Sequence, residues 1–80
     1  MERFRSTQSN QVVVGEIRAA MARRGVRPLA VAEAVGINRS GMYRRLNCET
    51  PFTIDEILAI ASYLKVPAGS FFAREMAVAS

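Results

Sequence analysis

The segment PLAVAEAVGINRSGMYRRL, residues 28–46, changes character at Gly36, and this change restricts the fold more than any other feature of the sequence. Before Gly36 the residues are mostly small and apolar, and after it three arginines surround one tyrosine. Glycine readily adopts the left-handed conformation that a tight turn needs, and Asn38 can cap a following helix. The segment therefore predicts two short helices, at about residues 28–35 and 39–46, joined by a turn.

This pair of helices has the features of a helix-turn-helix. Ala32 is small enough for two helices to cross closely, and Met42 can reach back into a core. If Met42 and Leu46 point inward, successive side chains at 100° per residue place Ser40 and Arg44 on the opposite side of the second helix. On the same outer part of this helix we expect Arg39, Gly41 and Tyr43. Helix pairs of this kind also occur in bundles that bind no nucleic acid.

The chain before this pair predicts one further helix. It runs from about Asn10 to Arg24 and ends at Gly25, with an apolar face formed by Val13, Val14, Ile17, Ala20 and Met21. Residues 1–9 are predicted to be a flexible N-terminal arm. The domain itself then covers residues 10–80.

The chain after the pair predicts two more helical segments. Thr53 and Glu56 have the spacing of a capping box, and Phe52 precedes them as expected for a hydrophobic staple with Ile57. The predicted core face of this helix consists of Ile57, Leu58, Ala61 and Leu64. A fifth segment starts near Pro67 and carries Phe71 and Phe72. No strand alternation appears, so the predicted fold class is all-α, with five helices.

The residue types give little support for catalysis or metal binding. The single cysteine, Cys48, excludes an internal disulfide, and the absence of histidine removes the commonest general base and the usual zinc sites built from Cys and His. We therefore expect no enzyme activity, no cofactor, no metal and no small-molecule substrate. The sequence has no apolar run of about 18 residues and no signal-peptide pattern, so we expect a cytoplasmic protein without a membrane span.

The charge is unevenly distributed along the chain. The formal net charge is +4, and ten of the eleven basic residues are arginine. Residues 1–50 carry nine arginines against four glutamates, a net charge of +5, whereas residues 51–80 carry −1. Arginine makes bidentate contacts with phosphate and with guanine, so a polyanion is expected to bind the first half of the chain. The alternative is that these arginines lie on a solvated surface and bind no polyanion.

The sequence resembles the lambda-repressor-like family, the Cro and phage-repressor type of helix-turn-helix domain. The resemblance covers residues 14–72 and rests on the segments IRAAMARRGV, AVAEAVGINRSGMYRRLN, PFTIDEILAIASYLKVP and SFF. It implies a transcriptional regulator that binds operator DNA as a homodimer, with the helix at 39–46 in the major groove. A phage or prophage repressor in a bacterial or phage-infected cell is the expected biological setting.

The resemblance also implies contacts with DNA. Arg39 and Ser40 match the family's positions for base contact, and Asn47 matches a position that contacts the DNA backbone. Together with the outward face of the helix, this predicts base contacts by four residues: Arg39, Ser40, Tyr43 and Arg44. Backbone contacts are predicted for Arg27, Gly41, Arg45 and Asn47. Packing of Tyr43 against the protein, and pairing of Arg44 or Arg45 with Glu33 or Glu49, remain alternatives.

Some positions depart from the family pattern. Arg27 and Pro28 stand where a serine and a glutamine are common. Arg45 stands where an aliphatic core residue is common, so its guanidinium is expected to reach outward to solvent. Cys48 and Lys65 occupy turns that often carry glycine, which predicts some backbone strain.

Two other classes of function remain open on the sequence alone. One is a protein-interaction module on the same fold, such as an antitoxin-like partner or a regulatory subunit. The other is binding to a membrane surface through basic amphipathic helices, although mutual burial explains the apolar faces better.

Overall fold

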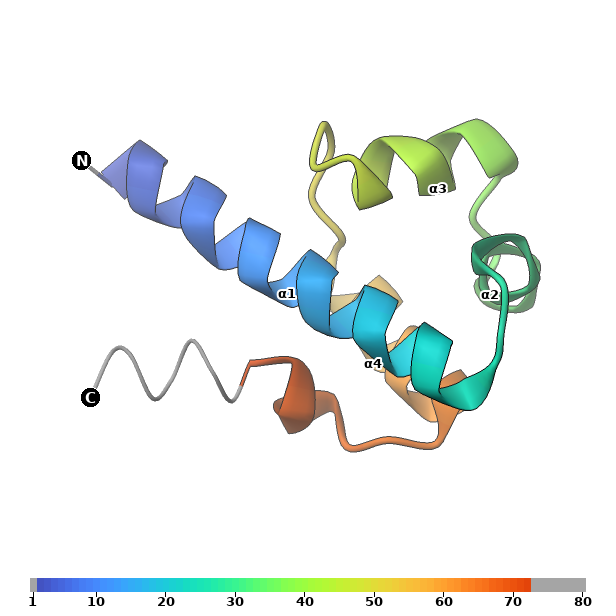
Figure 1. The fold of residues 1–80 in the computed structure, drawn as a ribbon. Helices are drawn as coiled ribbons and strands as arrows, with labels where there is room; N and C mark the ends of the chain where they lie inside the picture. Colours follow the sequence, from blue (N-terminus) through green and yellow to red (C-terminus); the bar gives the residue numbers. More distant parts are fainter. Residues whose placement is uncertain (1, 73–80) are drawn as a thin grey trace.

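A computed structural model describes the backbone of residues 2–72 and the side chains of residues 10–72. This part of the chain is all-helical and contains no strand. Its elements are α1 (Glu2–Arg24), α2 (Pro28–Val35), α3 (Arg39–Leu46), α4 (Ile54–Leu64) and a short 3-10 helix, η1 (Ala68–Phe71). In Figure 1, α1 runs along the molecule with α3 on one side and η1 on the other.

The bounds of α2 and α3 match the sequence prediction, whereas α1 is longer than predicted. It begins at Glu2 instead of Asn10, so the residues predicted as an arm are helical from Glu2 onward. No glycine or proline lies between Glu2 and Asn10, and the helical hydrogen bonds can therefore continue through this stretch. The N-terminal part of α1 extends beyond the other helices (Figure 1).

One core joins all five elements. Its buried apolar side chains are Val13, Val14, Ile17, Ala20, Met21, Val31, Ala32, Met42, Leu46, Phe52, Ile57, Ile60, Ala61, Leu64 and Phe71. The predicted faces of α1 and α3 are confirmed. In α4 the prediction for Leu58 is wrong, because Leu58 is 52% exposed and Ile60 is buried in its place. The buried residues of α4 follow the i, i+3, i+4, i+7 pattern from Ile57, and Leu58 lies outside that stripe.

The C-terminal part of the described chain differs from the prediction of a fifth helix. Between Pro67 and Phe72 it forms a single turn of 3-10 helix, with Phe71 buried and Phe72 half-buried against the core. Serine and glycine in this turn favour a short element over a long helix. Residues 73–80, on which the predicted continuation of this segment falls, lie outside the described residues.

Glycines and two other residues close the turns in the left-handed conformation. Gly25 and Gly36 have φ of 66° and 82°, as expected for helix ends. Cys48 and Lys65 have φ of 63° and 59°, which confirms the strain predicted where glycine is absent. Asn47, which directly follows α3, has a φ of −89°, so the left-handed residue of this turn is Cys48.

Candidate nucleic-acid interface

The turn between α2 and α3 is fixed by backbone hydrogen bonds. The N–H of Gly36 donates to the carbonyl of Ala32, and the N–H of Ile37 donates to the same oxygen at 2.9 Å. The first bond continues the helical pattern of α2, whereas the second spans five residues and depends on the left-handed conformation of Gly36. The two helices of the predicted helix-turn-helix therefore leave the turn at an angle set by local geometry.

The start of α3 is capped as the sequence predicts. The side-chain oxygen Oδ1 of Asn38 accepts a hydrogen bond from the N–H of Gly41 at 2.7 Å and another from Ser40 Oγ at 3.2 Å. A capping side chain satisfies one of the free N–H groups at the N-terminus of a helix. Residues Arg39 and Ser40 are thereby held in the first turn of α3, on the surface of the molecule.

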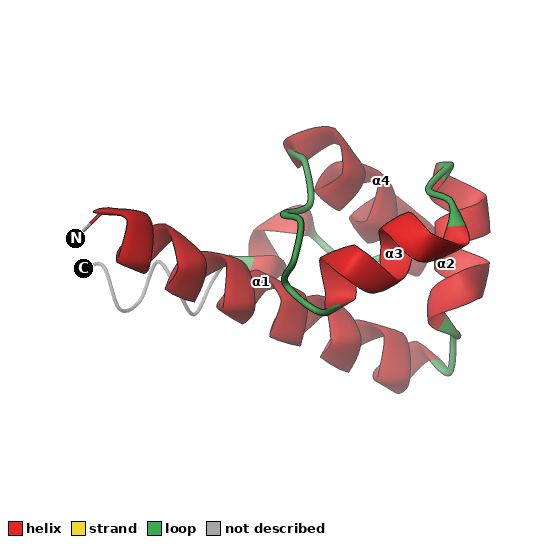
Figure 2. Cartoon of the chain, turned by 90° about the horizontal axis from the view of Figure 1, so that it is seen from above, coloured by secondary structure: helices red, strands yellow, loops and turns green. Residues whose placement is uncertain are grey.

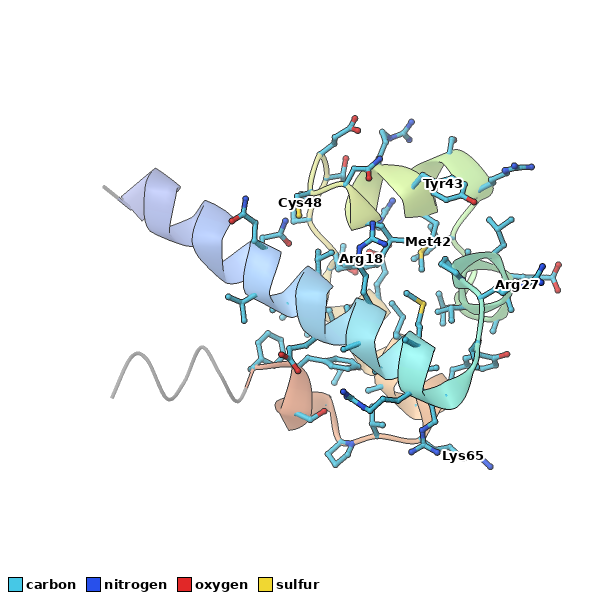
Figure 3. All side chains as sticks on the ribbon, in the orientation of Figure 1. Arg18, Arg27, Met42, Tyr43, Cys48 and Lys65 are labelled. Carbon is cyan, nitrogen blue, oxygen red and sulfur yellow. The ribbon has the colours of Figure 1, made fainter. Side chains whose placement is uncertain are left out.

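Figure 2 shows α3 lying in front of the other helices, so one side of it is uncovered. Met42 and Leu46 are buried beneath it, with 0% and 3% of their surface exposed. The four residues predicted to contact bases lie on its exposed part: Arg39, Ser40, Tyr43 and Arg44. Tyr43 is 42% exposed, while Figure 3 shows Met42 on the side of α3 that faces the body of the protein.

Two of the four residues predicted to contact the DNA backbone are exposed, and the other two, Gly41 and Arg45, are not. Arg27, immediately before α2, and Asn47, immediately after α3, are both exposed. Gly41 is buried, and a Cβ atom at this position would lie 2.9 Å from Asn38 Oδ1 and 3.0 Å from Arg45 Nη1. The absence of a side chain at Gly41 therefore makes room for the cap and for Arg45.

Arg45 does not reach outward as predicted. Its Nε and Nη2 atoms donate to the two carboxylate oxygens of Glu56 on α4, at 2.9 and 3.1 Å, and its Nη1 donates to the carbonyl of Gly41 at 2.9 Å. The side chains of Arg45 and Glu56 are 18% and 20% exposed. The sequence left Glu33 and Glu49 open as ion-pair partners of this arginine. Glu56 lies closer because the fold brings the N-terminus of α4 next to α3.

Glu56 has two functions at once. Its carboxylate accepts a hydrogen bond from the backbone N–H of Thr53 at 2.9 Å, which completes the predicted capping box. The same carboxylate also binds Arg45. Burial opposes ionisation of Glu56, but the hydrogen bonds from Arg45 and Thr53 and the charge of Arg45 outweigh it, so that the pKa is lowered. Glu56 is therefore ionised at neutral pH and able to hold Arg45.

Two arginines of α1 make contacts that the sequence did not reveal. Arg18 Nη2 donates to the carbonyl of Leu46, the last residue of α3, at 3.1 Å, and Figure 3 shows Arg18 extending from α1 toward this end of α3. Arg24 Nη2 donates to the carbonyl of Lys65, just after α4, at 3.1 Å. Cations at the C-terminus of a helix satisfy free carbonyls and interact favourably with the helix dipole. No local pattern could have identified these contacts, because the partners are 28 and 41 residues apart.

Two hollows lie beside α3. One, of about 300 Å³, is lined by Leu29, Ala32, Glu33, Ile37 and Arg39, next to the exposed start of the helix. The other, of about 220 Å³, is mostly polar and is lined by Gly36, Ile37, Asn38, Gly41, Arg44, Arg45 and Glu56. The ion pair of Arg45 and Glu56 forms part of the wall of this second hollow, so open space adjoins it on one side.

The capped, outward-facing α3 and the tight turn before it form a helix-turn-helix, and the family to which the chain belongs makes this a helix-turn-helix DNA-binding domain. The chain belongs to the BetR domain family, since the model of that family matches residues 8–79. Comparisons with curated proteins and with solved structures found no match. Within the described residues, none of the helices has the length and apolar character needed to cross a membrane.

Proposed function

We propose that this protein is a sequence-specific transcriptional regulator that inserts α3 into the major groove of double-stranded DNA, as Cro-type phage repressors do. The exposed face of α3 carries this proposal. Arg39, Tyr43 and Arg44 extend from a short helix whose other side is anchored in the core. A helix of this kind fits the major groove, which is about 12 Å wide. The protein acts by binding and needs no catalytic residue or cofactor.

The proposed base contacts follow from side-chain chemistry. Arg39 and Arg44 can each donate two hydrogen bonds to the O6 and N7 atoms of guanine, and the hydroxyl of Ser40 can bind several bases. Tyr43 offers an apolar ring for a thymine methyl group and a hydroxyl at its tip. In this proposal, Arg27 and Asn47, one at each end of the α2–α3 pair, donate hydrogen bonds to phosphate oxygens of the DNA backbone.

Binding as a homodimer is part of this proposal. One short helix contacts few base pairs, and a second copy on a roughly palindromic operator would double the number, with half-sites about 34 Å apart. The candidate dimer surface is the C-terminal segment, whose large apolar residues are Phe71, Phe72 and Met76. Phe71 is 1% exposed and belongs to the core, and Met76 lies outside the described residues.

Selection of bound duplexes from a random pool tests the proposed function. We expect one sequence to be enriched, as a palindrome if the protein binds as a dimer. Affinity for that duplex should fall steeply with salt, with a log–log slope of about −0.9 for each phosphate contacted. A pool without any enriched sequence would contradict the proposal and would favour a protein-interaction module on the same fold.

A further inference from the structure

The position of α3 depends on few apolar contacts. Only Gly41, Met42 and Leu46 of this eight-residue helix are buried, and just two of them have side chains that reach the core. Met42 and Leu46 are one turn apart and lie along one line of the helix. Two anchors on one line resist sliding, but they leave the helix free to rotate slightly about that line.

A first polar tether opposes this rotation from the side of α4. Arg45 binds both oxygens of Glu56 in a bidentate pair and also binds the carbonyl of Gly41 within α3. Glu56 is itself fixed by the capping box with Thr53. Bidentate pairs of this kind fix orientation as well as distance. Arg45 and Glu56 line the mostly polar 220 Å³ hollow, so apolar packing does not replace the tether on that side.

A second tether acts at the C-terminus of α3, on the residue that follows Arg45. Arg18 reaches from α1 to the carbonyl of Leu46 (Figure 3). The contact ties the C-terminus of α3 to the longest helix of the protein. The two tethers come from different helices and hold neighbouring residues of α3, Arg45 and Leu46, so together they oppose its rotation.

We propose that Glu56, through Arg45, and Arg18 are positioning residues that set the orientation of α3 for sequence readout. This inference rests on the proposed DNA-binding function and assigns Arg45 to the protein interior instead of the phosphate backbone. Base readout requires side chains to be held within about 0.5 Å and 10–20° of the correct geometry. Phosphate contacts by flexible arginines tolerate larger errors. Loss of a tether should therefore reduce the preference for the selected duplex, while the affinity for random duplex stays unchanged.

The test compares Glu56→Gln with Thr53→Ala by measuring affinity for the selected duplex and for random duplex. Glutamine can still complete the capping box, so Glu56→Gln removes the ion pair but keeps the cap. Thr53→Ala weakens the cap and leaves the ion pair. We expect Glu56→Gln to reduce the preference for the selected duplex about tenfold, with no loss on random duplex, and Thr53→Ala to keep the preference. Equal loss of preference in both variants would show general destabilisation and overturn the inference.

A double-mutant cycle with Arg45→Gln separates positioning from direct contact. If Arg45 acts only with Glu56, the double variant should show the same preference as either single variant. If Arg45 contacts phosphate, Arg45→Gln should weaken binding to both duplexes in either background and make the salt slope shallower by about 0.9, which would overturn its assignment.

The second tether is tested in a part of the protein remote from the capping box, which keeps the inference testable if Glu56→Gln does not fold. Arg18→Met and Arg23→Met remove the same charge from α1, but only Arg18 binds α3. We expect a loss of preference for Arg18→Met alone. Unchanged preference in Arg18→Met and Glu56→Gln would overturn the positioning role while leaving the DNA-binding function intact. Absence of any preference in the unmodified protein would overturn both.

Discussion

Met42 is fully buried, whereas the next residue, Tyr43, is 42% exposed. This contrast between two consecutive side chains shows that α3 has one side in the core and one side at the surface. The helix is anchored by its inner residues and presents its outer residues without further cover (Figure 2). Its stability and its capacity to bind DNA therefore depend on different side chains.

Substitutions at these two positions should differ strongly in their effect on stability. Met42→Ala should lower the free energy of unfolding by about 2–5 kcal/mol, because it removes buried apolar contacts and leaves a cavity. Tyr43→Ala should change it by no more than about 0.5 kcal/mol, because the ring is largely at the surface. Urea unfolding measures both values. Similar losses in the two variants would contradict the orientation of α3.

Arg39 should contribute to base preference. Arg39→Ala should weaken binding to the selected duplex by roughly 1–3 kcal/mol and relax the preference at one base pair. Arg23→Ala, which removes the same charge from the exposed end of α1, is the matched control and should leave the preference intact. Fluorescence anisotropy with duplexes altered at single positions provides the measurement. An equal loss on every duplex would instead assign Arg39 to a phosphate contact.

Stability should depend on pH through Glu56. The pKa of Glu56 is lowered in the folded protein from its ordinary value of 4.5, so its contribution is complete above pH 4.5. It is lost as the pH falls through the lower pKa of the folded state, where the carboxylate becomes protonated. Glu56→Gln should remove this part of the acid dependence. Unfolding free energies of the two proteins between pH 3 and pH 7 would reveal it, and parallel curves would contradict the prediction.

The left-handed conformation of Gly36 and Lys65 predicts that substitutions at these two positions will differ in their effect on stability. Gly36→Ala should lower the free energy of unfolding by about 1–2 kcal/mol, because alanine is strained at a φ of 82° although its Cβ would meet no neighbour. Lys65→Gly, at a φ of 59°, relieves the same strain and should not destabilise the protein. Thermal unfolding compares the two variants. A larger loss for Lys65→Gly than for Gly36→Ala would show that strain does not govern these turns.

The helix boundaries around the turn could be predicted because they depend on interactions between close neighbours. Gly36 ends α2 through its own conformation, and Asn38 caps α3 through the N–H of a residue three positions later. The capping box of α4 spans the same short distance. Such interactions need no knowledge of the remaining fold, so residue type and spacing identify them.

The error at Leu58 has a different origin. Both Leu58 and Ile60 are apolar, and their burial depends on where α2, α1 and η1 lie around α4. Hydrophobicity identifies residues that can be buried, but the neighbouring helices decide which of them are covered.

By itself, therefore, the sequence determined where α2 and α3 begin and end, where α4 begins, and which side of α3 is apolar. The tertiary structure decided that Arg45 binds Glu56 and that Arg18 binds the carbonyl of Leu46. Long arginine side chains can reach many partners, and the partner that is chosen depends on which helix end the fold brings near. That choice joins residues 11 and 28 positions apart, a distance over which spacing along the chain carries no information about contact.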